Sequence, residues 1–240
     1  MSKDLELFRS WVDEAEQGSI VFFGGAGVST ASGIPDFRSA EGIFTKQGHL
    51  SPERLVSASY FWEHPEEFYE FYRAKLVFPD VKPNAAHIKL AELEREGKLS
   101  AIITQNVDGL HQAAGSKRVL ELHGSMHRNY CLDCDKTYDL SFVLQAESVP
   151  VCEVCGGHVR PDVVLYEEGL NEALLEESAL AIAKANILII GGTSLVVFPA
   201  AGLVRYFKGN HLVIVNHTPT PQDSFADLCL RQDIAEVFSW

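Results

Sequence analysis

The sequence has no apolar run long enough to cross a membrane. Its longest apolar stretch, near 187–190, is far shorter than the roughly 20 residues that a transmembrane helix needs. The first residues, MSKDLE, are polar and partly acidic, unlike a secretory signal peptide. The terminal segments, 1–18 and 233–240, are short and leave no room for a long targeting extension. We therefore expect a cytoplasmic protein with no membrane partner.

Positive charge is also scarce. The 20 Lys and Arg residues stand against 33 Asp and Glu residues, which gives a formal net charge of −13. Nonspecific binding to nucleic acid requires clustered positive charge, so we expect no direct nucleic-acid partner. An acidic surface is common in soluble enzymes and can favour basic peptide segments. The 240 residues, 46% of them hydrophobic, suffice for one globular core with a smaller attached module.

Cysteine is rare, and four of the five cysteines are regularly spaced. Cys131, Cys134, Cys152 and Cys155 form the pattern C-x2-C-x17-C-x2-C, the spacing of a zinc ribbon. Four sulfur ligands leave no open position for water or substrate, so we expect one structural zinc ion and a catalytic centre elsewhere. The remaining Cys229 is expected to be a small buried hydrophobe. This usage fits a reducing compartment better than a disulfide framework.

Apolar strands alternate with helical patterns through much of the chain. The expected strands are 20–23, 101–104, 187–190 and 212–216, and the expected helices include 5–15, 85–96 and 172–185. This alternation predicts an α/β protein with a parallel sheet covered on both faces. Two segments interrupt it, an aromatic-rich helical stretch at about 36–83 and the cysteine segment at 131–155. We expect them to form a second lobe across a cleft from the sheet.

Glycine-rich and polar motifs follow the predicted strands. Gly25-Ala-Gly27 comes directly after the first strand, where a nucleotide pyrophosphate can bind. Thr30 stands at the third glycine of the dinucleotide fingerprint, which argues against an ordinary dehydrogenase. The run Gly191–Ala200 begins with a small polar turn suited to phosphate. Its Val196-Val197-Phe198 stretch is expected to be extended, either as an edge that captures a peptide or as a buried structural strand.

Several polar residues in these motifs have two interpretations each, one functional and one structural. Asn106 and Asp108 can bind the donor and acceptor of a carboxamide, or form a turn cluster before a helix. His123 ends a short strand and could act as a general base near neutral pH, although a lone histidine is usually structural. Asn216 could bind a ribose hydroxyl or form a turn. Asp36-Phe37-Arg38 alone favours a rigid loop with ordinary packing.

Taken in order, these motifs resemble the sirtuins, the NAD-dependent protein-lysine deacylases. The matching segments are GAGVS, GIPDFR, TQNVD, ELHG, the four cysteines, VRPDVV, GTSL and IVN, and they span nearly the whole chain. The resemblance implies one catalytic core, 1–240, of a small prokaryotic member. It divides the chain into a Rossmann-like domain of about 1–35, 84–125 and 160–240 and a small zinc-bearing lobe of about 36–83 and 126–159. An acyl-lysine protein or peptide would bind between them.

The resemblance also implies the site. The residues expected to contact NAD are Gly25, Ala26, Gly27, Ser29, Asp36, Phe37, Arg38, Gln105, Asn106, Asp108, Gly192, Thr193, Ser194 and Asn216. Asn106 and Asp108 would hold nicotinamide and act with His123 as catalytic residues, while Phe37 shields the reactive sugar carbon from water. The residues expected to contact the peptide are Val164, Tyr166, Glu167, Val196 and Phe198.

The reaction implied by the family consumes NAD. The acyl oxygen of lysine displaces nicotinamide to give an alkylimidate, and His123 takes a proton from the ribose hydroxyls. Attack of the hydroxyl and then of water releases lysine and O-acyl-ADP-ribose. His123 must be neutral to accept the proton, so activity should fall as pH drops through its pKa.

The chain departs from the family pattern in three places. Gly24 stands where many sirtuins have Thr, and Tyr166-Glu167-Glu168 replaces the common Phe-Gly-Glu. The second change adds a carboxylate to the substrate-pairing loop, which would favour peptides with basic neighbours. The helical stretch 68–73 lacks the Tyr-x-x-Arg pair that recognises succinyl or malonyl groups in some relatives. We therefore expect acetyl and longer neutral acyl substrates.

Three other functions remain open on the sequence. A protein ADP-ribosyltransferase would pass the ribose to a protein nucleophile, although the intact His123 argues against this as the main activity. A non-catalytic NAD-sensing or zinc-ribbon interaction module would bind NAD without releasing nicotinamide. A zinc-bearing dehydrogenase would return the cofactor reduced. In each case we expect a monomer.

Overall fold

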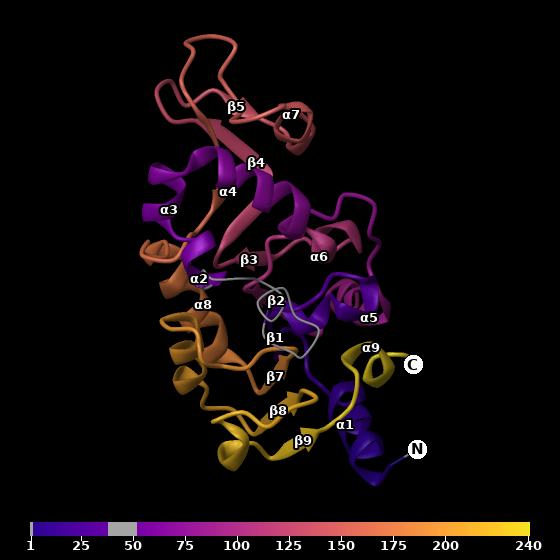
Figure 1. The fold of residues 1–240 in the computed structure, drawn as a ribbon. Coiled ribbons are helices and arrows are strands. Elements are labelled where there is room, and N and C mark those ends of the chain that lie inside the picture. The colour runs from indigo at the N-terminus through magenta and orange to yellow at the C-terminus, as the bar shows by residue number, and fades with distance from the viewer. Residues whose placement is uncertain (1, 38–51) are drawn as a thin grey trace.

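The larger part of the molecule is a parallel sheet. The computed structural model describes residues 2–37 and 52–240, and its main sheet has six parallel strands in the order β3-β2-β1-β7-β8-β9 (Figure 1). These strands are β1 Ile20–Gly24, β2 Leu99–Thr104, β3 Val119–Glu121, β7 Ile187–Gly191, β8 His211–Val215 and β9 Leu228–Leu230. The parallel sheet expected from the apolar runs is confirmed, and β9 was not expected.

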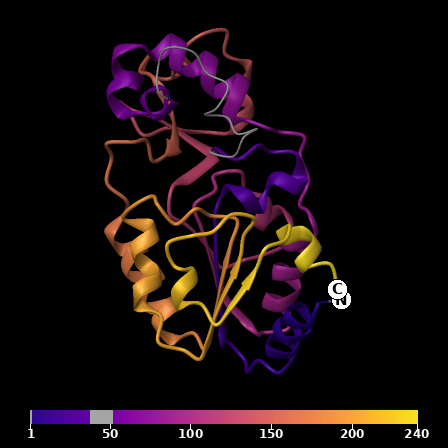
Figure 2. The same ribbon diagram turned by 60° about the horizontal axis from the view of Figure 1, so that its bottom comes forward.

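Helices cover both faces of this sheet because its strands are apolar on both sides. Phe22 of β1 packs into one core with Phe8 of α1 (Lys3–Asp13) and Leu90 of α5 (Ala85–Arg95), and the short α9 (Ile234–Val237) joins them. Phe23, pointing the other way, packs in a second core with Ile182 of α8 (Glu172–Lys184) and with the 3-10 segment η5 (Ala200–Tyr206). Figure 2 shows these two groups of helices on opposite sides of the sheet.

The helices begin where polar side chains cap them. Ser2 accepts from the Leu5 amide at the start of α1, and Asn171 accepts from the Leu174 amide at the start of α8. Asn84 caps α5 in a reciprocal arrangement with His87, whose Nδ1 accepts from the Asn84 amide at 3.3 Å. The predicted helices lie within two residues of the observed ones.

The smaller part contains a three-stranded antiparallel sheet in the order β5-β4-β6 and a group of short helices. The strands are β4 Gly124–Cys131, β5 Thr137–Tyr138 and β6 Val159–Val163, and the helices are α2 Pro52–Leu55, α3 Ala58–Glu63, α4 Pro65–Phe71 with a π-helical extension Tyr72–Leu76, and α7 Leu140–Gln145. A third core joins them, with Phe61 and Phe68 of the helices packed with Met126 and Val159 of the strands. This core stacks aromatic rings from α3 and α4 edge to face.

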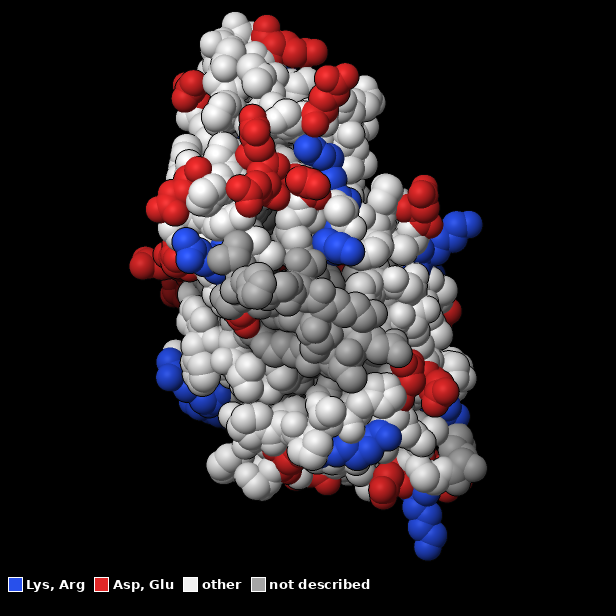
Figure 3. Space-filling view, viewed as in Figure 1, with Lys and Arg blue, Asp and Glu red and all other residues white. Residues whose placement is uncertain are grey.

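Figure 3 shows the charge on one face of the molecule, with acidic side chains gathered mainly over the smaller part. The exposed glutamates Glu63, Glu66, Glu67 and Glu70 lie on α3 and α4. No helix among the described residues is long and apolar enough to cross a membrane.

Candidate functional site

The predicted site motifs meet at one edge of the parallel sheet. Gly24, Thr104, Gly191 and Val215 are the last residues of their strands, and they lie in register across β2, β1, β7 and β8. The chain therefore leaves all four strands at the same edge, where ligands of open α/β sheets bind. The glycine turn, the 105–108 segment, the Gly192 turn and Asn216 all follow directly from these ends.

The glycine turn after β1 is held against the turn after β7. The Gly25 amide donates to the Gly191 carbonyl at 3.1 Å, and the Gly27 amide donates to the Gly192 carbonyl at 2.8 Å. A Cβ atom on Gly27 would lie 2.8 Å from the Gly192 Cα, so only glycine permits this approach. The turn continues as two short 3-10 segments, Ala26–Val28 and Thr30–Ser32, and not as a long helix.

The packing around Gly24 explains why this chain has glycine at that position. A Cβ atom at this position would lie 2.6 Å from Cε1 of Phe22 and 3.2 Å from a methyl group of Val28. Phe22 is fully buried and cannot move aside easily. The absence of a larger residue here is therefore coupled to the ring of Phe22.

The buried Ser29 and Asn106 and the partly buried Asp108 form one polar cluster. The Ser29 hydroxyl donates to Asp108 Oδ2 at 2.6 Å and accepts from Asn106 Nδ2 at 3.1 Å. Asp108 Oδ1 accepts from the Leu110 amide at 2.9 Å, so this residue also caps the turn before α6 (Leu110–Ala113). The turn cluster expected for Asp108 is therefore confirmed, and its binding of a carboxamide stays a prediction. The cluster places a carboxylate and a carboxamide side by side, a combination that can read an amide.

His123 is oriented by the backbone of the neighbouring strand end. Its Nδ1 lies 2.9 Å from the carbonyl oxygen of Gln105. A carbonyl can only accept, so Nδ1 carries the proton and Nε2 keeps its lone pair. Burial lowers the pKa of His123 below the usual value, and the hydrogen bond to Gln105 opposes that shift in part. The imidazole is thus a neutral base with its free nitrogen fixed in direction.

Gln105 connects the base to both phosphate-type turns. Its amide donates to the Gly24 carbonyl at 3.0 Å, and its side chain donates to Thr193 Oγ1 at 3.0 Å. Thr193 Oγ1 also accepts from the Leu195 amide, which closes the turn around Ser194. The polar residues predicted in the 105–108 and 192–194 segments are therefore in direct contact.

The other predicted NAD residues have more varied settings. Asn216 donates through Nδ2 to the Thr218 carbonyl at 2.8 Å, so its side chain closes a local turn. Phe37 packs against the third core, and Asp36 is partly exposed beside it. Arg38 lies outside the described residues. The loop before Phe37 is attached to α5, because Asn84 Nδ2 donates to the Ser32 hydroxyl at 3.0 Å.

Val196–Phe198 was expected to be extended, and this prediction is wrong. The Val197 carbonyl accepts from the Ala201 amide, so the chain already turns here toward η5. Val196 is 49% exposed and Phe198 is 73% exposed, which rules out the buried structural strand. Pro199 follows immediately, and its ring favours a turn over continued pairing. The two apolar side chains are left facing solvent.

Cys229 lies on β9 and is partly buried against the second core, close to the buried position expected for it.

The predicted peptide segment 163–168 bridges the two parts of the molecule. The Val164 amide donates to the His123 carbonyl, and the Tyr166 amide donates to the Val56 carbonyl, both at 3.0 Å. Glu167 adopts a left-handed φ of +77°, which costs a non-glycine residue on the order of 1–3 kcal/mol. Its carboxylate is bound to Ser59, and Glu168 forms an ion pair with Arg160. The added carboxylate of this loop, that of Glu167, is therefore bonded to another residue of the chain at the protein surface.

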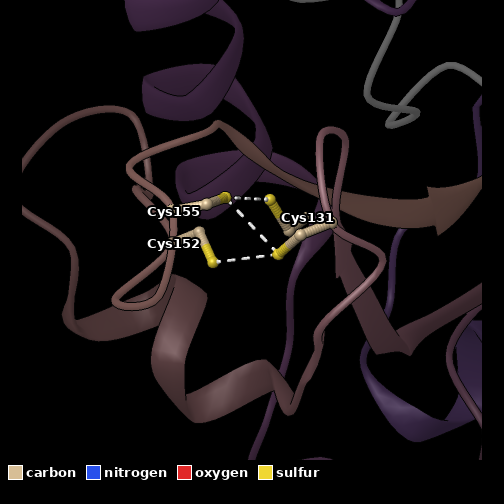
Figure 4. Close-up of side chains that lie close together, drawn as sticks. Cys131, Cys152 and Cys155 are labelled. Carbon is tan, nitrogen blue, oxygen red and sulfur yellow. Dashed lines mark hydrogen bonds between the residues drawn. The ribbon is translucent and has the colours of Figure 1, made fainter.

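The four cysteines predicted as metal ligands come together at the end of the smaller part. Figure 4 shows the sulfur atoms of Cys131, Cys152 and Cys155 facing a common centre, and the ligand atoms of all four cysteines lie within 4.8 Å of one another. Three sulfur–sulfur distances are 3.4 to 3.6 Å. A tetrahedron of sulfurs about 2.3 Å from a zinc ion has edges of about 3.8 Å, so the residues fit this metal.

Sequence reasoning missed a buried histidine pair behind the polar cluster. The rings of His87 and His111 are 4.7 Å apart, both side chains are buried, and neither His111 nitrogen has a hydrogen-bond partner among the described residues. Burial lowers the pKa of His87 to about 4, partly opposed by Asp108. Burial and the neighbouring His87 lower the pKa of His111 to about 3. The Asn84-x-x-His87 capping pattern was the one available signal.

This pair should make the fold sensitive to acid. In the unfolded chain each histidine takes up a proton near pH 6.5, whereas the folded chain resists protonation, so stability falls as pH drops below that value. Between pH 6.5 and about pH 4.5, wild type should lose about 2–3 kcal/mol more unfolding free energy than His111→Leu. Urea unfolding of both proteins across this range measures the difference.

The matched control is His217→Gln, which changes an exposed histidine. Acid also weakens thiolate–metal binding, and the comparison removes that shared effect. Equal pH slopes for wild type and His111→Leu would contradict the assignment.

Comparison with known proteins adds a family to this geometry. Residues 25–199 match the model of the Sir2 family. The chain is 58% identical over 226 residues to an NAD-dependent protein deacetylase of Clostridium acetobutylicum, over 93% of this chain and 92% of that protein. It is 46% identical over 240 residues to a protein of the same name from Staphylococcus aureus, over 99% and 97% of the two chains.

Solved structures show the same likeness. A Sir2 structure with a deacetylated p53 peptide and 3′-O-acetyl-ADP-ribose matches with a TM-score of 0.88 at 40% identity, over 98% of this chain and 96% of that one. A Sir2 structure with a p53 peptide and NAD+ matches with a TM-score of 0.85 at 40% identity, over 99% and 96%. A structure bound to a propionylated peptide matches with a TM-score of 0.84 at 40% identity, over 98% and 95%.

Proposed function

The chain belongs to the Sir2, or sirtuin, family and is an NAD-dependent protein deacetylase, and we propose that the residues described above carry this activity. The enzyme consumes NAD as a co-substrate and releases nicotinamide, deacetylated lysine and O-acetyl-ADP-ribose. The observation that carries the assignment of roles is the link between the Ser29–Asn106–Asp108 cluster and His123. Gln105, whose carbonyl binds His123, and Asn106, which belongs to the cluster, are consecutive residues directly after β2. Both lie at the edge of the sheet where ligands of such folds bind.

Each part of the edge suits one part of NAD. Asn106 and Asp108 hold the carboxamide of nicotinamide, since together they offer a donor and an acceptor beside each other. We assign the phosphates to the turns Gly25–Gly27 and Gly192–Ser194. Because the amides of Gly25, Gly27 and Gly192 are bonded within the protein, these glycines act by close backbone approach, and Ala26 and Ser194 are assigned the polar contacts. We assign Arg38, Gln105 and Asp36 to the nicotinamide-side ribose and its surroundings, and Asn216 to the adenosine ribose. Phe37 shields the sugar carbon once nicotinamide has left.

His123 accepts the proton in this scheme. Its Nε2 has the free lone pair because Nδ1 donates to Gln105, and its burial keeps the ring neutral at physiological pH. A ribose hydroxyl that loses its proton to Nε2 becomes a nucleophile toward the acyl group. The bound NAD supplies the sugar carbon from which nicotinamide departs.

The substrate is an acyl-lysine protein or peptide, and we assign its contacts to Val164, Tyr166, Glu167, Val196 and Phe198. The exposure of Val196 and Phe198 supports this role, because two apolar side chains are left available beside a turn. Neutral acyl groups, acetyl first, fit the helical module. Tyr69 and Tyr72 are both buried, and the Tyr69 hydroxyl donates to the Val159 carbonyl, so neither is placed to bind an acyl carboxylate.

The zinc ion has a structural role. Cys131, Cys134, Cys152 and Cys155 would hold it with four thiolates, and such a set contributes folding energy without an open coordination position. We propose one catalytic core, 1–240, with a large domain of about 1–35, 84–125 and 160–240 and a small lobe of about 36–83 and 126–159. The monomeric state, the cytoplasmic location and the lack of a nucleic-acid partner are parts of the same proposal.

Mass spectrometry of an acetyl-lysine peptide incubated with the protein and NAD tests the function. Equal amounts of deacetylated peptide, nicotinamide and O-acetyl-ADP-ribose support it. Nicotinamide together with an ADP-ribosylated protein would favour the transferase instead. Unchanged NAD across several acyl groups would favour a binding module, and an absorbance band of reduced nicotinamide would favour a dehydrogenase.

A further inference from the structure

We propose that Glu167 is a positioning residue that fixes the peptide-binding segment 163–168 to the helical module and thereby lowers the KM for peptide. The inference rests on the proposed function, since it takes this segment as the peptide site. The Phe-Gly-Glu pattern common in sirtuins has glycine at this point, so the glutamate side chain is a departure from that pattern.

Both oxygens of the Glu167 carboxylate are used by one residue of α3. Oε2 accepts from the Ser59 amide at 2.9 Å, and Oε1 accepts from the Ser59 hydroxyl at 3.0 Å. Ser59 Oγ also lies 3.1 Å from the hydroxyl of Ser57. The two residues are 108 positions apart in sequence. Both residues are exposed, and a charged acceptor with two donors on one residue makes the contact directional.

Backbone pairing next to Glu167 extends the same junction. Tyr166 and Ser57 form a parallel bridge, in which the Tyr166 amide donates to Val56 and the Ala58 amide donates to Tyr166. At its other end the segment reaches the base, because the Val164 amide donates to the His123 carbonyl at 3.0 Å. Glu167 lies at the opposite end of the segment from Val164, so loss of its contact should displace the peptide site while the Val164–His123 bond holds the other end in place.

The contact with Ser59 restrains the unusual backbone conformation of Glu167. Its φ of +77° suits glycine, whereas glutamate adopts it only if something else holds it there. The two bonds to Ser59 provide that restraint. Glycine would adopt the same conformation without strain but without the tether. Alanine would keep the strain and lose the tether, and glutamine would keep an acceptor for the amide and a donor for the hydroxyl.

The series Glu167→Gln, Glu167→Gly and Glu167→Ala tests the proposal by its order. The peptide KM should stay within about twofold of wild type for Gln, rise several-fold for Gly and rise about tenfold or more for Ala. The kcat and the KM for NAD should change by less than about threefold throughout, because neither the base nor the NAD edge is altered. Glu70→Ala, an exposed glutamate of α4, removes the same charge and serves as the control.

A purely electrostatic role for the carboxylate predicts a different order. Attraction of basic peptide residues depends on charge alone, so Gln and Ala would then raise KM equally and the effect would shrink at high salt. That result would overturn the positioning role, as would a series in which all three variants behave like wild type. A double-mutant cycle of Glu167→Ala with Ser59→Ala should show coupling, and strict additivity would contradict the contact.

Hydrogen exchange separates this inference from the function itself. The amides of Ala58 and Tyr166 should exchange faster in Glu167→Ala than in wild type, whether or not any substrate is turned over. Equal exchange would overturn the tether while leaving deacetylation intact. If wild type shows the tether by exchange but deacetylates nothing, the proposed function fails and the contact stands.

Discussion

His123→Ala is expected to lower kcat/KM for an acetyl-lysine peptide by about 10²- to 10⁴-fold, the usual contribution of a positioned general base. The loss follows from the removal of Nε2, the only nitrogen of this ring left with a lone pair by the bond to Gln105. NAD affinity should change little. Among the described residues, no hydrogen bond joins the imidazole of His123 to the side chains of the Ser29–Asn106–Asp108 cluster, so the cluster should stay intact. Product formation is followed by mass spectrometry and NAD binding by calorimetry.

The pH profile distinguishes loss of a base from loss of packing. Only neutral His123 accepts a proton, so wild-type kcat/KM should fall on the acid side as pH drops through a pKa below the usual histidine value. His64→Gln, which removes an exposed histidine between α3 and α4, should keep the wild-type profile. An alanine variant with wild-type rates, or one that keeps the same acid limb, would refute the assignment of the base.

Loss of the zinc ion should have the largest effect on stability. Structural zinc contributes about 10–16 kcal/mol of binding energy in zinc-finger peptides. Here two of the four cysteines, Cys131 and Cys152, also belong to the third core. Strong chelation should therefore unfold the small lobe and abolish peptide turnover. Metal analysis should give about one zinc per chain, as four thiolates at one centre require.

The exposed ligands allow the metal effect to be isolated. Cys134 and Cys155 are exposed, so Cys134→Ala or Cys155→Ala removes a ligand without opening a cavity in the core. Either change should lower the melting temperature sharply and release zinc, whereas Cys229→Ala should keep both. Retention of the wild-type melting temperature after removal of Cys134 and Cys155 together would show that the cluster does not depend on metal.

Short-range features of this protein were predictable from the sequence alone. The strands at 20–24 and 187–191 are continuous apolar runs, and such runs suit only a strand buried on both faces. The cysteine pattern needed no tertiary information because each pair is a local hairpin with a fixed reach. The motifs after the strands were also placed correctly, since parallel strands all end at the same edge.

Contacts between distant residues were decided only by the tertiary structure. The Ser29–Asp108 bond spans 79 positions and the Glu167–Ser59 bond spans 108, and no local preference specifies either pair. The extended form expected for Val196–Phe198 was wrong because the Val197 carbonyl is bonded to Ala201 and starts a turn. The burial of His111 likewise depends on which helices cover Phe22.

The sequence by itself determined the α/β class, the four-cysteine cluster and the strand ends at which the predicted site motifs lie. Each follows from side-chain type and spacing along a few residues, which act locally. The tertiary structure decided the direction of the His123 lone pair, the engagement of the Glu167 carboxylate and the depressed pKa values of His87 and His111. These depend on register, burial and long-range hydrogen bonds, which arise only when the elements pack together.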